Sequence, residues 1–281
     1  MLDAPYRGPL GDPGRPSGVP LPPDRLPLLR AGRLRKRWRY VGVYDAGAML
    51  CVGLVRIGPA LQAFWAIWDR RTGTLHERTV LRPGVVTLAP GQARVRDGTT
   101  TIELAFDEEG GAPVETVTPY GRGYAWTAKR GALPVRGRWR IGDDERAIDG
   151  LGIVDDSAGY PPRRTSWRWS AGVGHDATGR PVAWNLVDGI HDDPEASERT
   201  LWVAGEPRHL PPARFAADLS SVSAGALDLR FDEEAVRRRR ENLLVVRSDY
   251  EQPFGTFHGR LADGVELAEG FGVIERHDAV W

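Results

Sequence analysis

The second half of the chain is a diverged copy of the first half, and this repeat constrains the fold more than any other feature. Three segments recur in the same order, at offsets of 129, 125 and 120 residues. The offsets drift slowly, as loops of unequal length would make them drift. The matched segments are Trp38–Tyr40 with Trp167–Trp169, Ile102–Glu109 with Leu227–Glu234, and Gly150–Asp155 with Gly270–Glu275. The repeat predicts two tandem units of one architecture.

The repeat and the distribution of proline predict a division of the chain into three parts. Residues 1–32 contain eight prolines and no apolar block, which predicts an extended N-terminal arm because proline fixes φ and removes a backbone donor. Residues 33–160 and 161–281 then form two units of roughly 120 residues each, near the commonest domain size.

The dominant hydrophobic period within both units is two, which is typical of half-buried strands. Ile102, Leu104 and Phe106 alternate with more polar neighbours, and Leu227, Leu229 and Phe231 repeat the pattern. Short strands at even spacing predict an all-β fold of two lipocalin-like antiparallel barrel or sandwich units. We expect further strands at Trp38–Tyr44, Ala48–Ile57, Ala60–Trp68, Thr74–Leu81, Val114–Pro119, Tyr124–Lys129, Val135–Ile141 and Leu151–Asp155.

Charge and cysteine content restrict the partners. The chain has 38 basic and 38 acidic residues, so nothing in its net charge attracts a nucleic acid or an anionic membrane. The segment Asp232–Asn242, with its run Arg237–Arg240, is predicted to be a solvated turn or short helix. The single cysteine, Cys51, lies in an apolar run and is interpreted as a buried hydrophobe.

The chain lacks the sequence signatures of several classes of protein. No secretory signal or apolar stretch of membrane-spanning length is present, which predicts a cytoplasmic protein. No nucleotide-binding glycine pattern, nucleophile elbow or Cys/His array occurs either. We therefore expect no cofactor and no metal.

One predicted strand carries an aromatic face. In Arg164–Ser170, the side chains of Thr165, Trp167 and Trp169 share one face, and Arg164 lies on the other. The tryptophans either wall a cavity for an apolar small molecule or simply fill the core.

Two carboxylates occupy matched positions in the repeat. Asp155 and Glu275 each follow a Gly-x-Gly strand, and either could be a general acid in a dry pocket, where desolvation raises a carboxyl pKa. Alternatively, both are structural and pair with a neighbouring turn or with an arginine such as Arg164. His277 shares a face with Glu275, because the two lie two residues apart on an extended segment.

Differences between the copies indicate where function was acquired. Asn185 and Glu198 are polar positions beside predicted strands of the second unit and have no clear counterparts in the first. The candidate catalytic residues are thus Asp155, Glu275 and His277. The candidate ligand-binding residues are Arg164, Trp167, Trp169, Asn185 and Glu198.

Several motifs together resemble the bacterial family called domain of unknown function 2804. The motifs are Gly152–Asp155, Gly159-Tyr160, Arg164–Trp169, Gly179-Arg180, Asn185-Leu186, Glu198, Trp202–Gly205, Leu227–Phe231, Phe254-Gly255, Gly259 and Gly272–Glu275. The two-copy β pattern is also similar to the paired lipocalin-like domains of carotenoid hydratases. That second resemblance implies chemistry on an apolar small molecule, although fold alone does not fix function.

Two functions follow as expectations. The first is a protein that binds an apolar or amphipathic small molecule in a Trp-lined cavity. The alternative is a cofactor-independent hydratase, isomerase or cyclase acting on a lipid or terpenoid-like substrate, which requires a carboxyl group or histidine inside that cavity. A purely structural or interaction module, with both barrels filled by side chains, is a third possibility.

Overall fold

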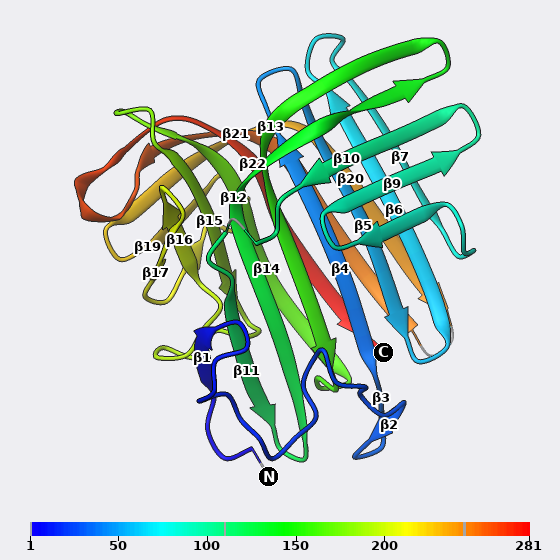
Figure 1. The fold of residues 1–281 in the computed structure, drawn as a ribbon, viewed down its shortest axis with the longest axis vertical. Helices are drawn as coiled ribbons and strands as arrows, with labels where there is room; N and C mark the ends of the chain where they lie inside the picture. The colour runs from blue at the N-terminus through cyan, green and yellow to red at the C-terminus, as the bar shows by residue number, and fades with distance from the viewer. Residues whose placement is uncertain (1, 110, 244–245) are drawn as a thin grey trace.

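A computed structural model describes residues 2–109, 111–243 and 246–281 and is built almost entirely of antiparallel strands. Two large sheets and one small hairpin, β2 (Leu29–Arg30) with β3 (Arg33–Leu34), make up the fold (Figure 1). The single helix described is the three-residue 3₁₀ turn η1 (Ala262–Gly264). The structure confirms the predicted all-β, lipocalin-like fold class.

The first sheet holds the strands of the N-terminal part of the chain. It contains β1 (Tyr6–Pro9), β4 (Lys36–Tyr44), β5 (Ala48–Ile57), β6 (Ala60–Asp69), β7 (Thr74–Val80), β8 (Val86–Ala89), β9 (Gln92–Asp97), β10 (Thr100–Phe106), β11 (Val114–Tyr120), β12 (Gly123–Ile141) and β13 (Asp144–Gly159). Its order is β7-β6-β5-β4-β13-β12-β10-β9-β8, and β11 pairs with both β12 and β1.

The second sheet has the same strand order. It contains β14 (Arg164–Asp176), β15 (Pro181–Asp188), β16 (Thr200–Val203), β17 (Glu206–His209), β18 (Arg214–Phe215), β19 (Ser221–Ala224), β20 (Leu227–Leu243), β21 (Val246–Arg260) and β22 (Glu266–Val280). Its order, β17-β16-β15-β14-β22-β21-β20-β19-β18, matches the first sheet when β4 is aligned with β14, β12 with β21 and β13 with β22. A tandem duplication predicts this correspondence.

The predicted strands agree closely with the observed ones, with one merger and one error. Tyr124–Lys129 and Val135–Ile141 form the single strand β12, bent by a bulge between Arg130 and Leu133. The prediction that Asp232–Asn242 is a solvated turn or short helix was wrong, because the segment continues β20 and pairs with β21.

The central strands are buried on both faces because each sheet packs against itself and against the other sheet. Val41 and Val43 of β4 belong to a core formed by the first sheet, and a second core is formed by the second sheet. Tyr40 and Tyr44 point to the opposite face and join a third core, which Trp169 and other second-sheet residues complete. The long strands β12, β13 and β14 lie at the centre of the molecule, where the two sheets meet (Figure 1).

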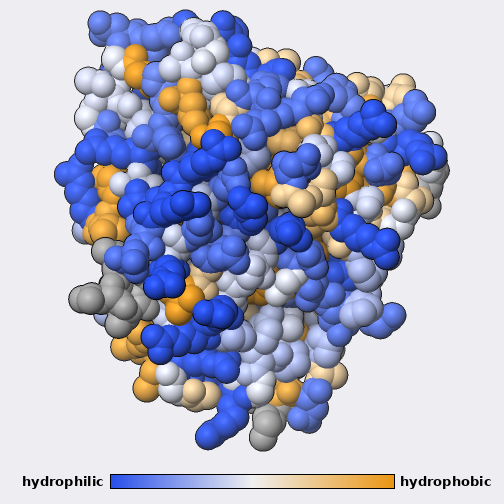
Figure 2. Space-filling model, turned by 180° about the vertical axis from the view of Figure 1, so that it is seen from behind, coloured by the Kyte–Doolittle hydropathy of each residue, from blue (hydrophilic) through white to orange (hydrophobic). Residues whose placement is uncertain are grey.

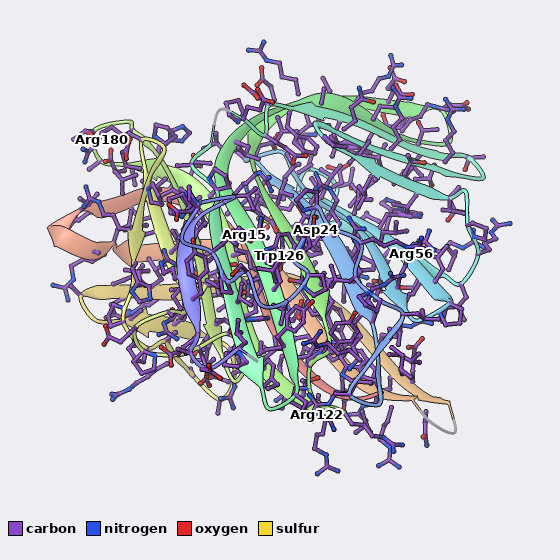
Figure 3. All side chains as sticks on the ribbon, turned by 60° about the horizontal axis from the view of Figure 1, so that its bottom comes forward. Arg15, Asp24, Arg56, Arg122, Trp126 and Arg180 are labelled. Atoms are coloured by element: carbon purple, nitrogen blue, oxygen red, sulfur yellow. The ribbon has the colours of Figure 1, made fainter. Side chains whose placement is uncertain are left out.

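The proline-rich arm is part of the packed structure. β1 pairs with β11, and Val19, Leu21 and Leu26 are buried against a cluster that includes Trp126. Arg15 forms an ion pair of 2.9 Å with the fully buried Glu115, and Figure 3 places this arginine close to Trp126. The arm therefore drapes over the first sheet and supplies apolar contacts to it.

The face of the molecule seen in Figure 2 is mostly hydrophilic. Figure 2 shows polar side chains over most of one face, with small hydrophobic patches between them. No helix in the described segments has the length and apolar character needed to cross a membrane.

Candidate functional site

A cavity of about 170 Å³ lies between the two sheets and is lined by residues of both. Most of the surface that it exposes is apolar, and the aromatic walls include Trp38 and Tyr40 of β4 and Trp167 and Trp169 of β14. These four residues are matched positions of the repeat, so each unit contributes one strand with two aromatic side chains. Tyr40 and Trp169 meet edge to face, with ring centroids 5.4 Å apart.

Glu275 lies in the wall of this cavity and is only 8% exposed. Its Oε1 accepts a hydrogen bond of 2.9 Å from Trp167 Nε1, and its Oε2 accepts one of 2.9 Å from Gln252 Nε2. The Tyr250 hydroxyl also hydrogen-bonds to this carboxyl group. Burial raises the pKa of Glu275 to about 7, against the opposing effect of the Trp167 and Tyr250 hydrogen bonds. The carboxyl group is thereby placed to exchange a proton near neutral pH.

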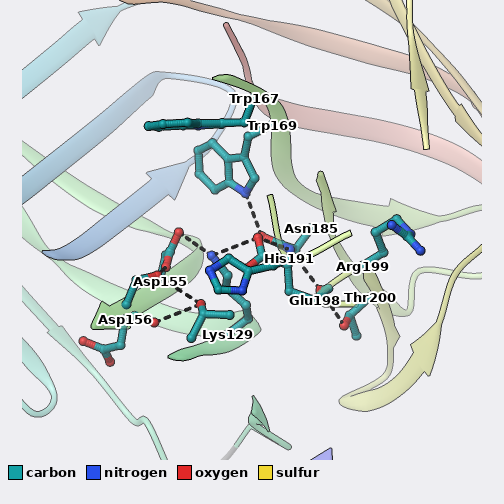
Figure 4. A network of polar contacts seen from close by, with 12 residues as sticks. Lys129, Asp155, Asp156, Trp167, Trp169, Asn185, His191, Glu198, Arg199 and Thr200 are labelled. Atoms are coloured by element: carbon teal, nitrogen blue, oxygen red, sulfur yellow. Dashed lines mark hydrogen bonds and ion pairs between the residues drawn. The ribbon is translucent and has the colours of Figure 1, made fainter. Parts of the chain in front are cut away.

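Asp155 belongs to a buried charge cluster at another part of the wall (Figure 4). Lys129 Nζ lies 2.5 Å from Asp155 Oδ2 and 3.2 Å from Glu198 Oε1, and all three side chains are almost fully buried. Burial alone would lower the pKa of Lys129, but the ion pairs with Asp155 and Glu198 outweigh it and raise that pKa. Lys129 therefore carries a charge between two carboxyl groups.

Asn185 and Trp169 hold this cluster in place from the second sheet. Asn185 Oδ1 accepts a hydrogen bond of 2.7 Å from Trp169 Nε1, and Asn185 Nδ2 donates one of 3.0 Å to the Glu198 carbonyl. Asn185 itself is buried and is not among the cavity-lining residues. Its contacts are those of a residue that positions Trp169 and Glu198.

Two histidines also line the cavity. His277 Nε2 lies 2.8 Å from Ser248 Oγ, and its ring packs against Trp167 with centroids 4.3 Å apart. Burial lowers the pKa of His277 to about 4, so this imidazole is neutral at pH 7. His191, which the sequence reasoning did not select, comes from the loop after β15, and burial lowers its pKa to about 3.

The structure thus brings together most of the residues selected from the sequence. Asp155, Trp167, Trp169, Glu198, Glu275 and His277 line the one cavity. Arg164 does not: it is exposed at the start of β14, where it pairs with Val280. The suggested pairing of Asp155 with Arg164 was wrong, because Lys129 of the adjacent strand β12 occupies that role.

Sequence reasoning also missed Lys129 and Arg237. Lys129 is one of only two lysines and stands in a predicted apolar strand, which was an available signal. Arg237 is 4% exposed and lies within the run that was predicted to be solvated. In an extended strand successive side chains face opposite sides, so Arg237 and Arg239 line the cavity while Arg238 and Arg240 are exposed.

No group of three or more His, Cys, Asp or Glu side chains in the described segments is arranged to hold a metal ion. The charged residues of the cavity instead pair with one another, as Lys129 does with Asp155 and Glu198.

Comparisons with solved structures give the fold. The crystal structure of kievitone hydratase from Nectria haematococca is similar with a TM-score of 0.51 at 11% identity, over 88% of each chain. An AttH-type protein from Nitrosomonas europaea is similar with a TM-score of 0.45 at 13% identity, over 91% of this chain and 98% of that one. CghA, in its structure with Sch210972, gives a TM-score of 0.42 at 13% identity over 88% of each chain. At 11% identity, the similarity to kievitone hydratase bears on the fold alone.

Comparisons of sequence give the family. No curated protein matches the chain. Residues 86–281 match the family described as "Domain of unknown function (DUF2804)", and since they make up more than half of the chain, the protein belongs to that family.

Proposed function

We propose that the protein is a cofactor-independent acid–base enzyme that hydrates, isomerises or cyclises a small apolar molecule containing a carbon–carbon double bond. The cavity between the two sheets is the proposed active site, and Glu275 is the proposed proton donor. Trp167 and Trp169 are proposed to hold the apolar body of the substrate.

The observation that carries this proposal is the environment of Glu275. Its carboxyl group lies in an aromatic cavity with hydrogen-bond donors but without a directly paired cation, and burial raises its pKa to about 7. A general acid works best when its pKa is near the working pH, since the acid form is then populated and the proton is still readily released.

The aromatic walls suit the positive charge that follows protonation of an alkene. The face of a tryptophan or tyrosine ring attracts a cation, by about 2 kcal/mol or more in a desolvated site. Trp38, Tyr40, Trp167 and Trp169 all line the cavity. After proton transfer, the Glu275 carboxylate can take a proton back from an adding water or from a neighbouring carbon.

The test is deuterium incorporation into small isoprenoid alkenes in D₂O, followed by mass spectrometry. The wild-type protein is expected to incorporate deuterium or form the alcohol, and Glu275→Gln is expected to lose at least 100-fold, within the usual contribution of about 10²–10⁴ from a general acid. Glu251→Gln is the matched control, because Glu251 is on the same strand pair but pairs with Arg238 and Arg276 and does not line the cavity. Equal turnover by wild type and Glu275→Gln would contradict the proposal.

A second candidate is a carrier that binds an apolar or amphipathic molecule without changing it. It is favoured by the ion pairs of Asp155 and Glu198 with Lys129, and by the lowered pKa of His277, which leaves that imidazole neutral at pH 7. Native mass spectrometry distinguishes the enzyme from the carrier. A ligand that copurifies with the protein and is released chemically unchanged after long incubation supports the carrier.

A further inference from the structure

In the part of the chain that the structure describes, three buried polar atoms of cavity-lining residues have no hydrogen-bond partner, and two of them are His191 Nε2 and Glu198 Oε2. Their residues are 2% and 3% exposed. A buried polar group without a partner costs about 1–3 kcal/mol, so such atoms in a native fold call for an explanation. The wall has one other such atom, Arg39 Nε, whose guanidinium already pairs with Asp156 and Glu108.

The surrounding contacts fix His191 in position. Its Nδ1 lies 2.9 Å from Thr118 Oγ1 of β11, and its carbonyl accepts a hydrogen bond of 3.1 Å from the Glu198 amide. The backbone of His191 has a φ of 51°, a left-handed conformation that is uncommon for a non-glycine residue. The Thr118 contact and the Glu198 amide therefore fix His191 at this point of the cavity wall.

Glu198 is fixed through its other oxygen. Oε1 contacts Lys129 Nζ at 3.2 Å and Asn185 Nδ2 at 3.4 Å, which leaves Oε2 as a free acceptor. Figure 4 shows the His191 ring beside Lys129 and the Glu198 carboxylate. Glu198 Oε2, an acceptor, and His191 Nε2 thus belong to two wall residues whose backbones hydrogen-bond to each other, which fits a group that both donates and accepts one hydrogen bond.

We propose that His191 Nε2 and Glu198 Oε2 bind a hydroxyl group of the ligand, so that the molecule taken by the cavity is an apolar alcohol or phenol. The hydroxyl donates its proton to Glu198 Oε2 and accepts one from His191 Nε2–H, while Thr118 Oγ1 donates to His191 Nδ1. This inference rests on the proposed function only in placing the ligand in the same cavity, and it needs no step of the reaction.

The test compares binding of three probes of one shape: 2-naphthol, 2-methoxynaphthalene and naphthalene. Titration calorimetry is expected to show that 2-naphthol binds about tenfold more tightly than the other two, the effect of one or two net hydrogen bonds. His191→Asn, whose short amide tolerates a left-handed φ, and Glu198→Leu are each expected to bring that ratio close to one. Val55→Ala, in the apolar wall, is the matched control and should keep the ratio.

The Glu275→Gln variant separates this inference from the proposed function. If it is inactive on alkenes but keeps the preference for 2-naphthol, both hold. If the preference is present while deuterium incorporation is absent in the wild type, the hydroxyl site stands and the enzyme proposal fails. Equal affinity for the three probes, no binding of any of them, or a preference unchanged in both His191→Asn and Glu198→Leu would overturn the hydroxyl site.

Discussion

Asp155 and Glu275 occupy matched positions in two sheets of the same strand order, yet one has a cationic partner and the other has a neutral one. Asp155 lies opposite Tyr40 of β4 and Lys129 of β12, whose ammonium is 2.5 Å away. Glu275 lies opposite Trp169 of β14, and its neighbour on β21 is the amide of Gln252 at 2.9 Å. The same backbone frame thus holds an aspartate paired with a lysine and a glutamate whose hydrogen-bond donors are neutral. Burial raises the pKa of both carboxyl groups, that of Glu275 to about 7, and Lys129 opposes the rise at Asp155.

The raised pKa of Glu275 predicts a loss of stability as the pH rises. Between its ordinary pKa of 4.5 and the folded value of about 7, the folded protein binds more protons than the unfolded chain, so the free energy of unfolding decreases with increasing pH. Wild type relative to Glu275→Gln is expected to lose about 3 kcal/mol between pH 4.5 and pH 8. Urea unfolding of both proteins at the two pH values measures this, and parallel pH dependences would contradict it.

Removal of the Lys129 charge should destabilise the protein strongly. Lys129→Met leaves Asp155 and Glu198 buried without a cation. Such a change is expected to lower the free energy of unfolding by about 3–5 kcal/mol. The measurement is the midpoint of urea unfolding. Arg138→Met, which breaks the exposed pair with Glu103, is the control and should shift the midpoint far less. Similar shifts for the two variants would show that the buried cluster carries no special cost.

The fold could be predicted from the sequence because its signals are local and repeated. Period-two alternation located the strands, and the same alternation put Glu275 with His277, and Trp167 with Trp169, on common faces. All four line the cavity.

The partners across strands could not be predicted in the same way. Lys129 and Asp155 are neighbours only through the register of β12 and β13, and Glu198 reaches them from a loop of the second unit. Arg164 was selected as a polar residue of the strand that carries Trp167 and Trp169, but the strand directs it to solvent. The alternation of inward and outward side chains in the run that begins at Arg237 is typical of a strand. The charge of the run instead suggested a solvated segment.

Arg237 is expected to stabilise the contact between the two sheets. From β20 it forms an ion pair of 2.8 Å with Glu77 of β7, and its guanidinium lies 4.7 Å from the centre of the Phe64 ring. Arg237→Leu should lower the free energy of unfolding by about 2–4 kcal/mol, because it leaves Gln252 and Tyr250 without a buried donor. The measurement is the midpoint of thermal unfolding. The comparison variant is Arg238→Leu, because Arg238 is an exposed neighbour that pairs with Glu251. Equal midpoints of thermal unfolding for the two variants would show that Arg237 does not stabilise the contact between the sheets.

Arg7 of the N-terminal arm is expected to hold the segment that carries Glu198. Its Nη1 donates to the Ser197 carbonyl at 2.6 Å and its Nη2 to Thr200 Oγ1 at 3.0 Å, so the arm ties the first sheet to residues on either side of Glu198. Arg7→Ala should therefore speed amide hydrogen exchange at residues 197–200 by about tenfold or more, since hydrogen bonds to a charged group contribute about 1.5–3 kcal/mol. Exchange in the core of the second sheet, at residues such as Leu229, should stay unchanged. Arg25→Ala, an exposed arginine of the same arm, is the control. Unchanged exchange at residues 197–200 in Arg7→Ala would mean that the second unit holds Glu198 without the arm.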